Sequence, residues 1–192
     1  MLEVHPVTAE RWQDLADFFG PSGAFSHCWC TWWRQTSAEF SRGVESKGQA
    51  NRALMRATVE AGSEPGLLAY REGRPVGWIS VAPRTQYGRV IRSRRIGPPA
   101  DAATDETVWS VVCFWIPRTE RGRGIATGLL SAAVAHARLR GAAALEGYPV
   151  DTAGGKQADA NLFTGTVAMF RRAGFSEVDR PRGAQLVVRR SL

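Results

Sequence analysis

The chain has 192 residues, of which 44% are hydrophobic and 22% are charged, and its formal net charge is +7. This balance is typical of a globular protein and excludes a disordered or fibrous chain, and the length fits one domain over residues 1–192. The sequence contains no apolar run of about 18 residues, and its start has neither a basic leader nor a hydrophobic signal core. We therefore expect a soluble, cytoplasmic protein with no membrane partner.

The positive charge is carried almost entirely by arginine, since Lys47 and Lys156 are the only lysines. The one local cluster of arginines runs from Arg84 to Arg95, and we interpret it as a solvated loop. Because the charge forms no dedicated polybasic patch, we expect no nucleic-acid partner.

The cysteines give no sign of a disulfide framework or a metal site. Cys28, Cys30 and Cys113 cannot all pair with one another. The Cys-Trp-Cys spacing is wrong for a zinc knuckle, and no second pair of ligands follows it. We therefore expect no bound metal.

The first third of the chain indicates one strand and two helices. Residues 2–7 alternate as in a short strand, and Thr8 is a plausible cap for a helix that reaches Phe19. A second helix is predicted over residues 46–61 from the spacing of its apolar residues.

The middle of the chain indicates three strands. Residues 66–70 and 75–81 flank Glu72-Gly73, a natural tight connection between antiparallel strands. A connection rich in proline, glycine and arginine follows over 83–105. Residues 108–116 form a continuous apolar run, which predicts a strand buried on both faces at the centre of the sheet.

The last third begins with a helix over 124–140, whose apolar residues recur at intervals of three and four. It continues with a strand over 142–148, a loop over 151–161, a short helix ending at Ala173-Gly174, and closing strands over 175–179 and 185–190. The expected fold class is α/β (α+β), a mixed, mostly antiparallel, twisted sheet of six to seven strands flanked by about four helices.

The loop between the central strand and the long helix is the most informative segment. Gly122 and Gly124 let the backbone approach a ligand, and the free N–H groups of the first helical turn favour an anion such as a diphosphate. Arg121 and Arg123 add positive charge. A tight turn with glycines for packing is the alternative. The loop lacks the residues of a Walker or dinucleotide-binding motif.

Arg121, Gly124 and Ala126 match the coenzyme A motif Arg/Gln-x-x-Gly-x-Gly/Ala, and the chain resembles the GNAT acetyltransferase superfamily over nearly its whole length. The resemblance implies acetyl-CoA as acyl donor, held where the central strand and the next strand part. Pro149, which has no N–H, is compatible with strands that part there. The implied cofactor-binding residues are Phe114, Trp115, Ile116, Arg121, Gly122, Arg123, Gly124, Ile125, Ala126 and Thr127.

The resemblance also implies catalytic candidates. Glu146 falls where related N-terminal acetyltransferases carry a glutamate base; the alternative is a glutamate satisfied by the backbone or by arginine. The tyrosine that usually protonates the thiolate aligns with Phe170, so Tyr148 is the substitute acid, with a packing tyrosine as the alternative. A backbone N–H at or near Ile116 would stabilise the oxyanion.

The resemblance places the acceptor pocket partly in the region after the first helix, where Phe25, Trp29 and Trp33 could bind an apolar or cationic acceptor. Core packing is the alternative for some of them. The expected activity is transfer of an acetyl group from acetyl-CoA to a primary amine of a small molecule, by a monomer or homodimer. Acetylation of a protein N-terminus or lysine, and a non-catalytic acyl-CoA sensor, remain open.

Overall fold

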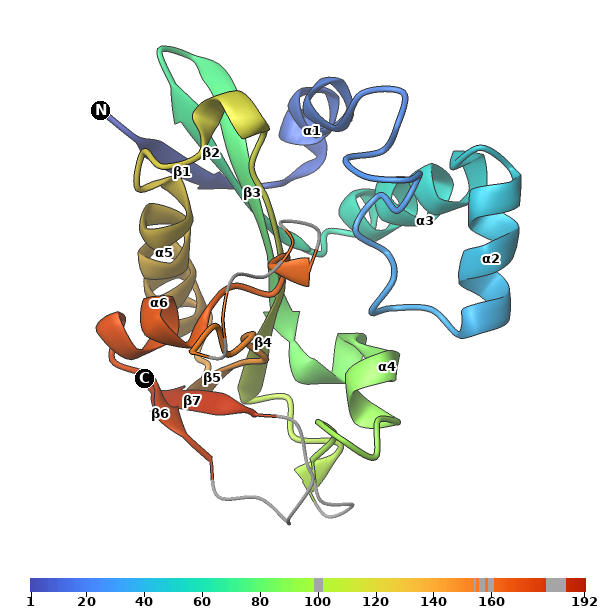
Figure 1. Ribbon diagram of the computed structural model, residues 1–192. Helices are drawn as coiled ribbons and strands as arrows, with labels where there is room; N and C mark the ends of the chain where they lie inside the picture. The colour runs from blue at the N-terminus through green and yellow to red at the C-terminus, as the bar shows by residue number, and fades with distance from the viewer. Residues whose placement is uncertain (99–101, 154, 156–157, 159–160, 179–185) are drawn as a thin grey trace.

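The structure is a computed structural model that describes residues 1–98, 102–153, 155, 158, 161–178 and 186–192 (Figure 1). Seven strands within these residues form one sheet, in the order β1-β2-β3-β4-β5-β7-β6. β4 and β5 are parallel, and the other neighbouring strands are antiparallel. The strands are β1 (Glu3–Pro6), β2 (Gly66–Arg71), β3 (Arg74–Pro83), β4 (Val108–Trp115), β5 (Ala144–Gly147), β6 (Ser176–Glu177) and β7 (Val188–Ser191). The expected mixed, mostly antiparallel sheet is confirmed.

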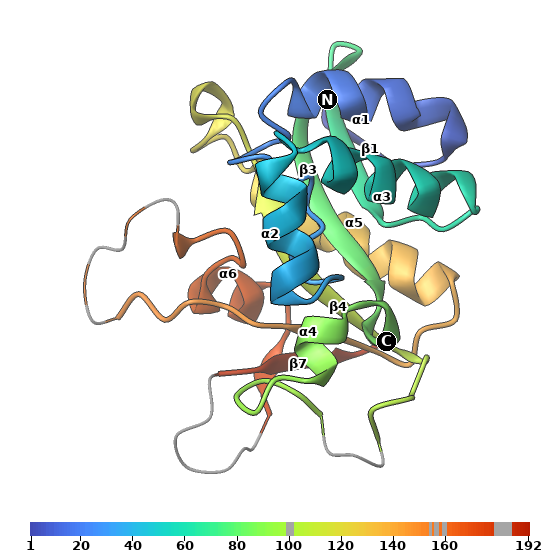
Figure 2. The same ribbon diagram turned by 90° about the vertical axis from the view of Figure 1, so that its right-hand side faces the viewer.

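Helices cover both faces of the sheet. Within the described residues the α-helices are α1 (Trp12–Phe19), α2 (Ser37–Glu45), α3 (Gln49–Glu60), α4 (Gly88–Ile91), α5 (Ile125–Leu139) and α6 (Val167–Arg172), and 3₁₀ helices occupy Ala9–Arg11, Arg84–Gln86 and Arg118–Glu120. α5 and α6 pack on one face (Figure 1). Figure 2 looks onto the opposite face, where α1, α3, α2 and α4 follow one another from top to bottom.

The spacing of apolar residues explains why α1 and α5 form where they do. In α1, Trp12, Leu15, Ala16 and Phe19 recur at intervals of three and four and are all buried. In α5 the buried residues are Ile125, Leu129, Leu130, Ala133, Val134 and Ala137. Each helix therefore presents one apolar stripe to the sheet.

The helices differ from the prediction in number. The predicted helix over 46–61 begins only at Gln49, and α2 precedes it, so six α-helices replace the expected four or so. α2 begins with a capping box, in which Thr36 and Glu39 satisfy one another's backbone amides. Its Gly43 lies against Asn51 of α3 so closely that a Cβ would overlap the amide of Asn51. α4 likewise lies inside the predicted connection over 83–105.

The predicted hairpin of β2 and β3 is confirmed, and the pairing of β3 with β4 contains a β-bulge. Glu72 and Gly73 both have positive φ, 52° and 72°, as a two-residue hairpin turn with right-handed strands requires. Between β3 and β4, Ser80 is opposite Cys113 and the next pair is Val81 with Val111. Val112 is therefore the extra residue of a β-bulge, close to the end of β5.

The closing strands are shorter than predicted. β6 covers Ser176–Glu177 and β7 covers Val188–Ser191, and β7 pairs with β5. The predicted ends at residues 179 and 185 lie outside the described residues.

Among the described helices, none has the length and apolar character needed to cross a bilayer.

Candidate functional site

The loop between β4 and α5 leaves backbone amides without partners. Gly122 and Gly124 have φ values of 75° and 77°, which glycine adopts without steric cost. Apart from the glycine itself and its chain neighbours, no heavy atom lies within 4 Å of the position that a Cβ would occupy at either residue. The amides of residues 122–127 find no acceptor in the described chain, and Gly124 begins α5 without a side-chain cap. This end of α5 is therefore open to an anion.

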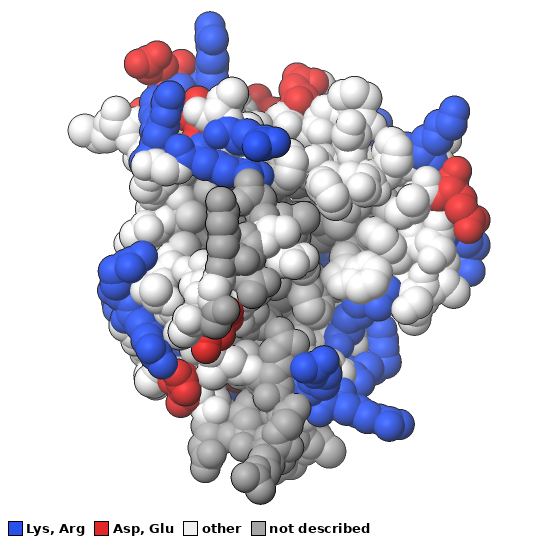
Figure 3. Space-filling view, viewed as in Figure 1, with Lys and Arg blue, Asp and Glu red and all other residues white. Residues whose placement is uncertain are grey.

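The two arginines of this loop have different contacts. Arg121 donates from Nε to the carbonyl oxygen of Ile116 at 3.1 Å, so it ties the loop to the end of β4. Arg123 is exposed and lies 3.5 Å from the carboxylate of Glu120, which also binds Arg71 at 2.7 Å. Figure 3 shows Lys and Arg side chains gathered where Figure 1 places this loop, with a few acidic residues beside them.

β4 and β5 part beside this loop. Their parallel pairing runs from Val108 with Ala144 to Val111 with Gly147. Beyond that point β4 continues to Trp115, paired only with β3. The pairing thus ends two residues before Pro149, and one edge of β4 is left without a strand neighbour among the described residues.

A later segment of the chain contacts that edge of β4. The amide of Phe114 donates to the carbonyl oxygen of Phe163 at 2.6 Å, and the amide of Val150 donates to that of Gly165 at 2.9 Å. A ligand that accepts from the Phe114 amide must therefore displace Phe163. Of the other predicted contacts on β4, Trp115 pairs with Trp78 and Ile116 accepts from Arg121.

Glu146 lies at the point where the strands part and is only 4% exposed. Its Oε2 accepts from Nη1 of Arg84 at 2.9 Å, and its Oε1 accepts from Nη2 and Nε of Arg189 at 2.6 and 3.0 Å. Two guanidinium groups therefore balance its charge. This arrangement supports the alternative of an arginine-satisfied carboxylate more than that of a free base.

Sequence reasoning missed both arginine partners. Arg84 was assigned to a solvated loop, but it is 1% exposed, so that interpretation is wrong for this residue. Its Nη2 binds the carbonyl oxygen of Ala102 at 2.6 Å, and its Nε is buried without an acceptor in the described chain. No local pattern in the sequence could have indicated this ion pair, because Arg84 and Glu146 are 62 positions apart.

Tyr148 is fully buried beside Glu146. Its hydroxyl lies 2.8 Å from Oγ of Ser110 on β4 and 3.4 Å from Oε2 of Glu146. Burial, and secondly the charge of Glu146, raise the pKa of Tyr148 well above its ordinary value. The hydroxyl therefore stays protonated and can donate a hydrogen bond.

The predicted acceptor aromatics do not lie together. Trp33 stacks on Tyr148, with ring centroids 6.3 Å apart. Trp29 is 4% exposed and packs against Trp12 and Phe19, whereas Phe25 is 59% exposed. Only Trp33 contacts the catalytic candidates.

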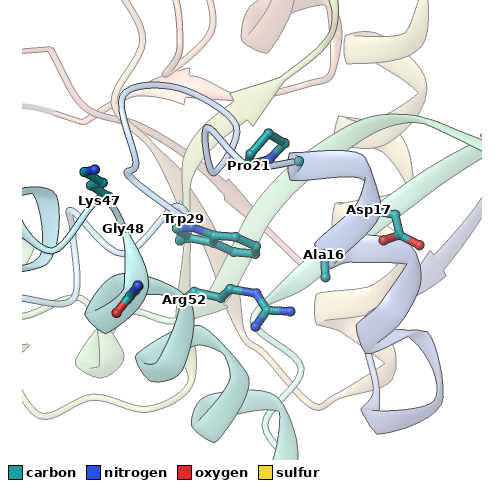
Figure 4. Close-up of a pocket in the computed structure, with 9 residues that line it drawn as sticks. Ala16, Asp17, Pro21, Trp29, Lys47, Gly48 and Arg52 are labelled. Atoms are coloured by element: carbon teal, nitrogen blue, oxygen red, sulfur yellow. The ribbon is translucent and has the colours of Figure 1, made fainter.

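Trp29 instead lines an open pocket between α1 and the start of α3, with a volume of about 420 Å³ (Figure 4). The guanidinium of Arg52 lies 5.5 Å from the centre of the Trp29 ring. None of the predicted coenzyme or catalytic residues lines this pocket. The residues that line it are Ala16, Asp17, Gly20, Pro21, Trp29, Lys47, Gly48, Gln49 and Arg52.

The three cysteines are free thiols, and Cys30 and Cys113 pack in the apolar cluster formed by α1, α3 and the sheet. Sγ of Cys30 accepts from Nε1 of Trp78 at 3.2 Å. Its hydrogen bond with Cys113 lowers the pKa of Cys30 and raises that of Cys113. Among the described residues, no group of three or more His, Cys, Asp or Glu side chains could hold a metal ion.

Comparison with known proteins adds to this geometry. The acetyltransferase (GNAT) family matches residues 27–175. A phosphinothricin acetyltransferase from Sinorhizobium meliloti, solved with acetyl-CoA, is 14% identical, with a TM-score of 0.54, over 100% of this chain and 88% of that one. The PaiA N-acetyltransferase from Thermoplasma acidophilum, solved with coenzyme A, is 12% identical, with a TM-score of 0.53, over 100% and 99% of the two chains.

A GCN5-related N-acetyltransferase from Kribbella flavida is 18% identical, with a TM-score of 0.53, over 100% of this chain and 98% of that one. At these identities the likeness shows a shared fold. No curated protein sequence matches this chain closely enough to establish a relationship.

Proposed function

Because the chain belongs to the acetyltransferase (GNAT) family, we propose that it transfers an acetyl group from acetyl-CoA to a primary amine of a small molecule. The observation that carries the proposal is the row of unpaired amides over residues 122–127, next to the parting of β4 and β5. An acyl-CoA needs both features. Its diphosphate requires an anion site, and its extended pantetheine arm requires a gap between neighbouring strands.

The residues around the loop fit such a donor. The amides of Gly122 to Thr127 would bind the diphosphate, with Arg123 exposed beside them. The arm would lie along the free edge of β4, where the Phe114 amide becomes available once Phe163 moves away. Ile125 is 2% exposed and packs against the sheet, so it contributes its amide and not its side chain.

Tyr148 is the group that we propose as proton donor to the departing thiolate. Its hydroxyl is protonated, and it lies beside the last paired residues of β4 and β5. Glu146 is the candidate base from the sequence, but both of its oxygens already accept from guanidinium groups. We therefore propose that Glu146 positions Tyr148 and that the amine attacks in its unprotonated form. The proton that the nitrogen then loses restores the Tyr148 hydroxyl after that hydroxyl has protonated the thiolate.

Release of free thiol from acetyl-CoA, measured with a panel of small amines, tests this function. Thiol release that depends on both an amine and the protein supports it. A non-catalytic acyl-CoA sensor is the second candidate, favoured by the ion-paired state of Glu146 and by Phe170 in place of the usual tyrosine. If acetyl-CoA raises Tm while no amine releases thiol, the sensor replaces the enzyme.

A further inference from the structure

The turn at Trp33-Arg34 lies over the point where β4 and β5 part. Trp33 stacks on Tyr148, which directly follows β5. The guanidinium carbon of Arg34 lies 4.8 Å from the centre of the Tyr87 ring. The hydroxyl of Tyr87 is 3.1 Å from Oγ of Ser80 on β3, and Ser80 is paired with Cys113 of β4. The turn therefore spans β3, β4 and the end of β5 on the face opposite α5.

α4 holds this turn in place. The amide of Arg89 donates to the carbonyl oxygen of Trp33 at 3.0 Å, and its Nε donates to that of Trp32 at 2.6 Å. The guanidinium of Arg89 also lies 3.6 Å from the centre of the Trp32 ring. These contacts hold the backbone directly before Arg34, so the turn is ordered before any ligand binds.

Three donors of this turn are buried and lack an acceptor in the described chain: Nε1 of Trp33, and Nε and Nη2 of Arg34. Nη1 of Arg34 donates to Oε1 of Gln86 at 2.8 Å, which orients the guanidinium. Nε and Nη2 form one edge of the guanidinium, and this edge matches the two oxygens of a carboxylate. A buried donor without an acceptor is unfavourable, so a ligand oxygen that accepts from these atoms would be stabilised by them.

Arg189 shows how the same edge is used elsewhere in this protein. Its Nε and Nη2 both donate to the carboxylate of Glu146. No described carboxylate occupies the corresponding edge of Arg34. The charge of Arg34 is therefore left for a ligand that enters above the catalytic candidates.

We infer that the acceptor amine carries a carboxylate, which binds the Nε and Nη2 edge of Arg34, with Nε1 of Trp33 as an additional donor. This inference rests on the proposed function. Neighbouring side chains cover these donors, so the ligand displaces that cover when it binds. The substrate class is therefore an amino acid and not a simple amine.

Matched pairs of amines that differ only by a carboxylate test the inference: lysine and cadaverine, ornithine and putrescine, phenylalanine and phenethylamine, tryptophan and tryptamine. Thiol release from acetyl-CoA gives kcat/KM for each. We expect the best amino acid to exceed its decarboxylated partner by at least about tenfold. Equal or better use of the decarboxylated amines overturns the inference but leaves the proposed function standing.

Variants of Arg34 assign the effect to this side chain. Arg34→Met should lower kcat/KM for the amino acid by about 100-fold and that for its decarboxylated partner by less than about threefold. Arg34→Lys keeps the charge but loses the planar edge, so its kcat/KM for the amino acid should lie between those of the wild type and Arg34→Met. Arg56→Met is the control, because Arg56 is an exposed α3 residue whose ion pair is with Glu60 of the same helix.

Acetyl-CoA affinity and circular dichroism show whether each variant is folded. A folded Arg34→Met that loses both members of a pair equally overturns the role of Arg34 in carboxylate binding. If acetyl-CoA binds but no amine of either kind releases thiol, the proposed function fails and this inference fails with it.

Discussion

Nη1 of Arg84 lies 2.9 Å from Oε2 of Glu146, and the two side chains are 1% and 5% exposed. The pair joins the segment after β3 to the end of β5, across β4. It therefore holds the end of β5 close to the segment that follows β3, at the point where β4 and β5 part. Removing one member of a buried pair leaves an uncompensated charge, which is strongly unfavourable.

Arg84→Met should accordingly destabilise the protein by about 3–5 kcal/mol, as measured by chemical denaturation. Arg189→Met is the matched comparison. It should cost less, because Arg189 is 41% exposed and Glu146 keeps its buried partner. Equal losses of unfolding free energy in the two variants would show that the burial of Arg84 adds nothing to the stabilising effect of its ion pair.

Tyr148→Phe should lower kcat by about 100-fold, because it removes the proposed proton donor, and it should leave acetyl-CoA affinity nearly unchanged. Steady-state kinetics and calorimetry check the two halves. Tyr70→Phe is the control, since its hydroxyl binds Asp14 of α1 at 2.6 Å, away from the site. Wild-type turnover in Tyr148→Phe would remove this tyrosine from the mechanism.

All three tyrosines should resist ionisation in the folded protein. Burial raises the pKa of Tyr70, Tyr87 and Tyr148 above the ordinary value of 10.0. The unfolded chain therefore loses these protons first, and the free energy of unfolding falls as the pH rises above about 10. Tyrosinate absorbance should appear together with unfolding, whereas its appearance in a fully folded protein would contradict the burial of these side chains.

Phe170 explains why Gly147 has no side chain. A Cβ at Gly147 would lie 2.3 Å from Cε1 of Phe170, whose ring also contacts those of Phe114 and Phe175. Gly147→Ala should therefore destabilise the protein by about 1–3 kcal/mol through overpacking.

Phe170→Leu should relieve part of that cost, so the double variant should be more stable than the sum of the single effects by about 1 kcal/mol. Urea denaturation of all four proteins measures this coupling. Strict additivity would show that the alanine methyl group is accommodated without moving Phe170.

The sequence predicts elements whose residues interact locally. α5 follows from the spacing of Ile125, Leu129 and Ala133, β4 follows from its continuous apolar run, and the hairpin follows from Glu72-Gly73. α2 was missed because it contains few apolar residues, although its capping box at Thr36 and Glu39 is visible in the sequence.

The site is harder to predict because its contacts join distant segments. Arg84 and Arg189 reach Glu146 from 62 and 43 positions away, so no local pattern shows them. The directions of Trp29 and Trp33 also depend on the backbone, because Trp29 and Cys30 have positive φ values of 48° and 52°. Such conformations are rare for these residues, and apolar spacing does not indicate them.

Calorimetric titration of acetyl-CoA into Gly124→Glu and Gly141→Glu tests the proposed coenzyme site most directly. Both glycines have positive φ, 77° and 80°, and open space around them, so the two variants carry the same strain and the same added charge. Only Gly124 adjoins the unpaired amides. We predict at least about 100-fold weaker binding for Gly124→Glu and wild-type affinity for Gly141→Glu; wild-type affinity in Gly124→Glu would contradict the assignment of this loop.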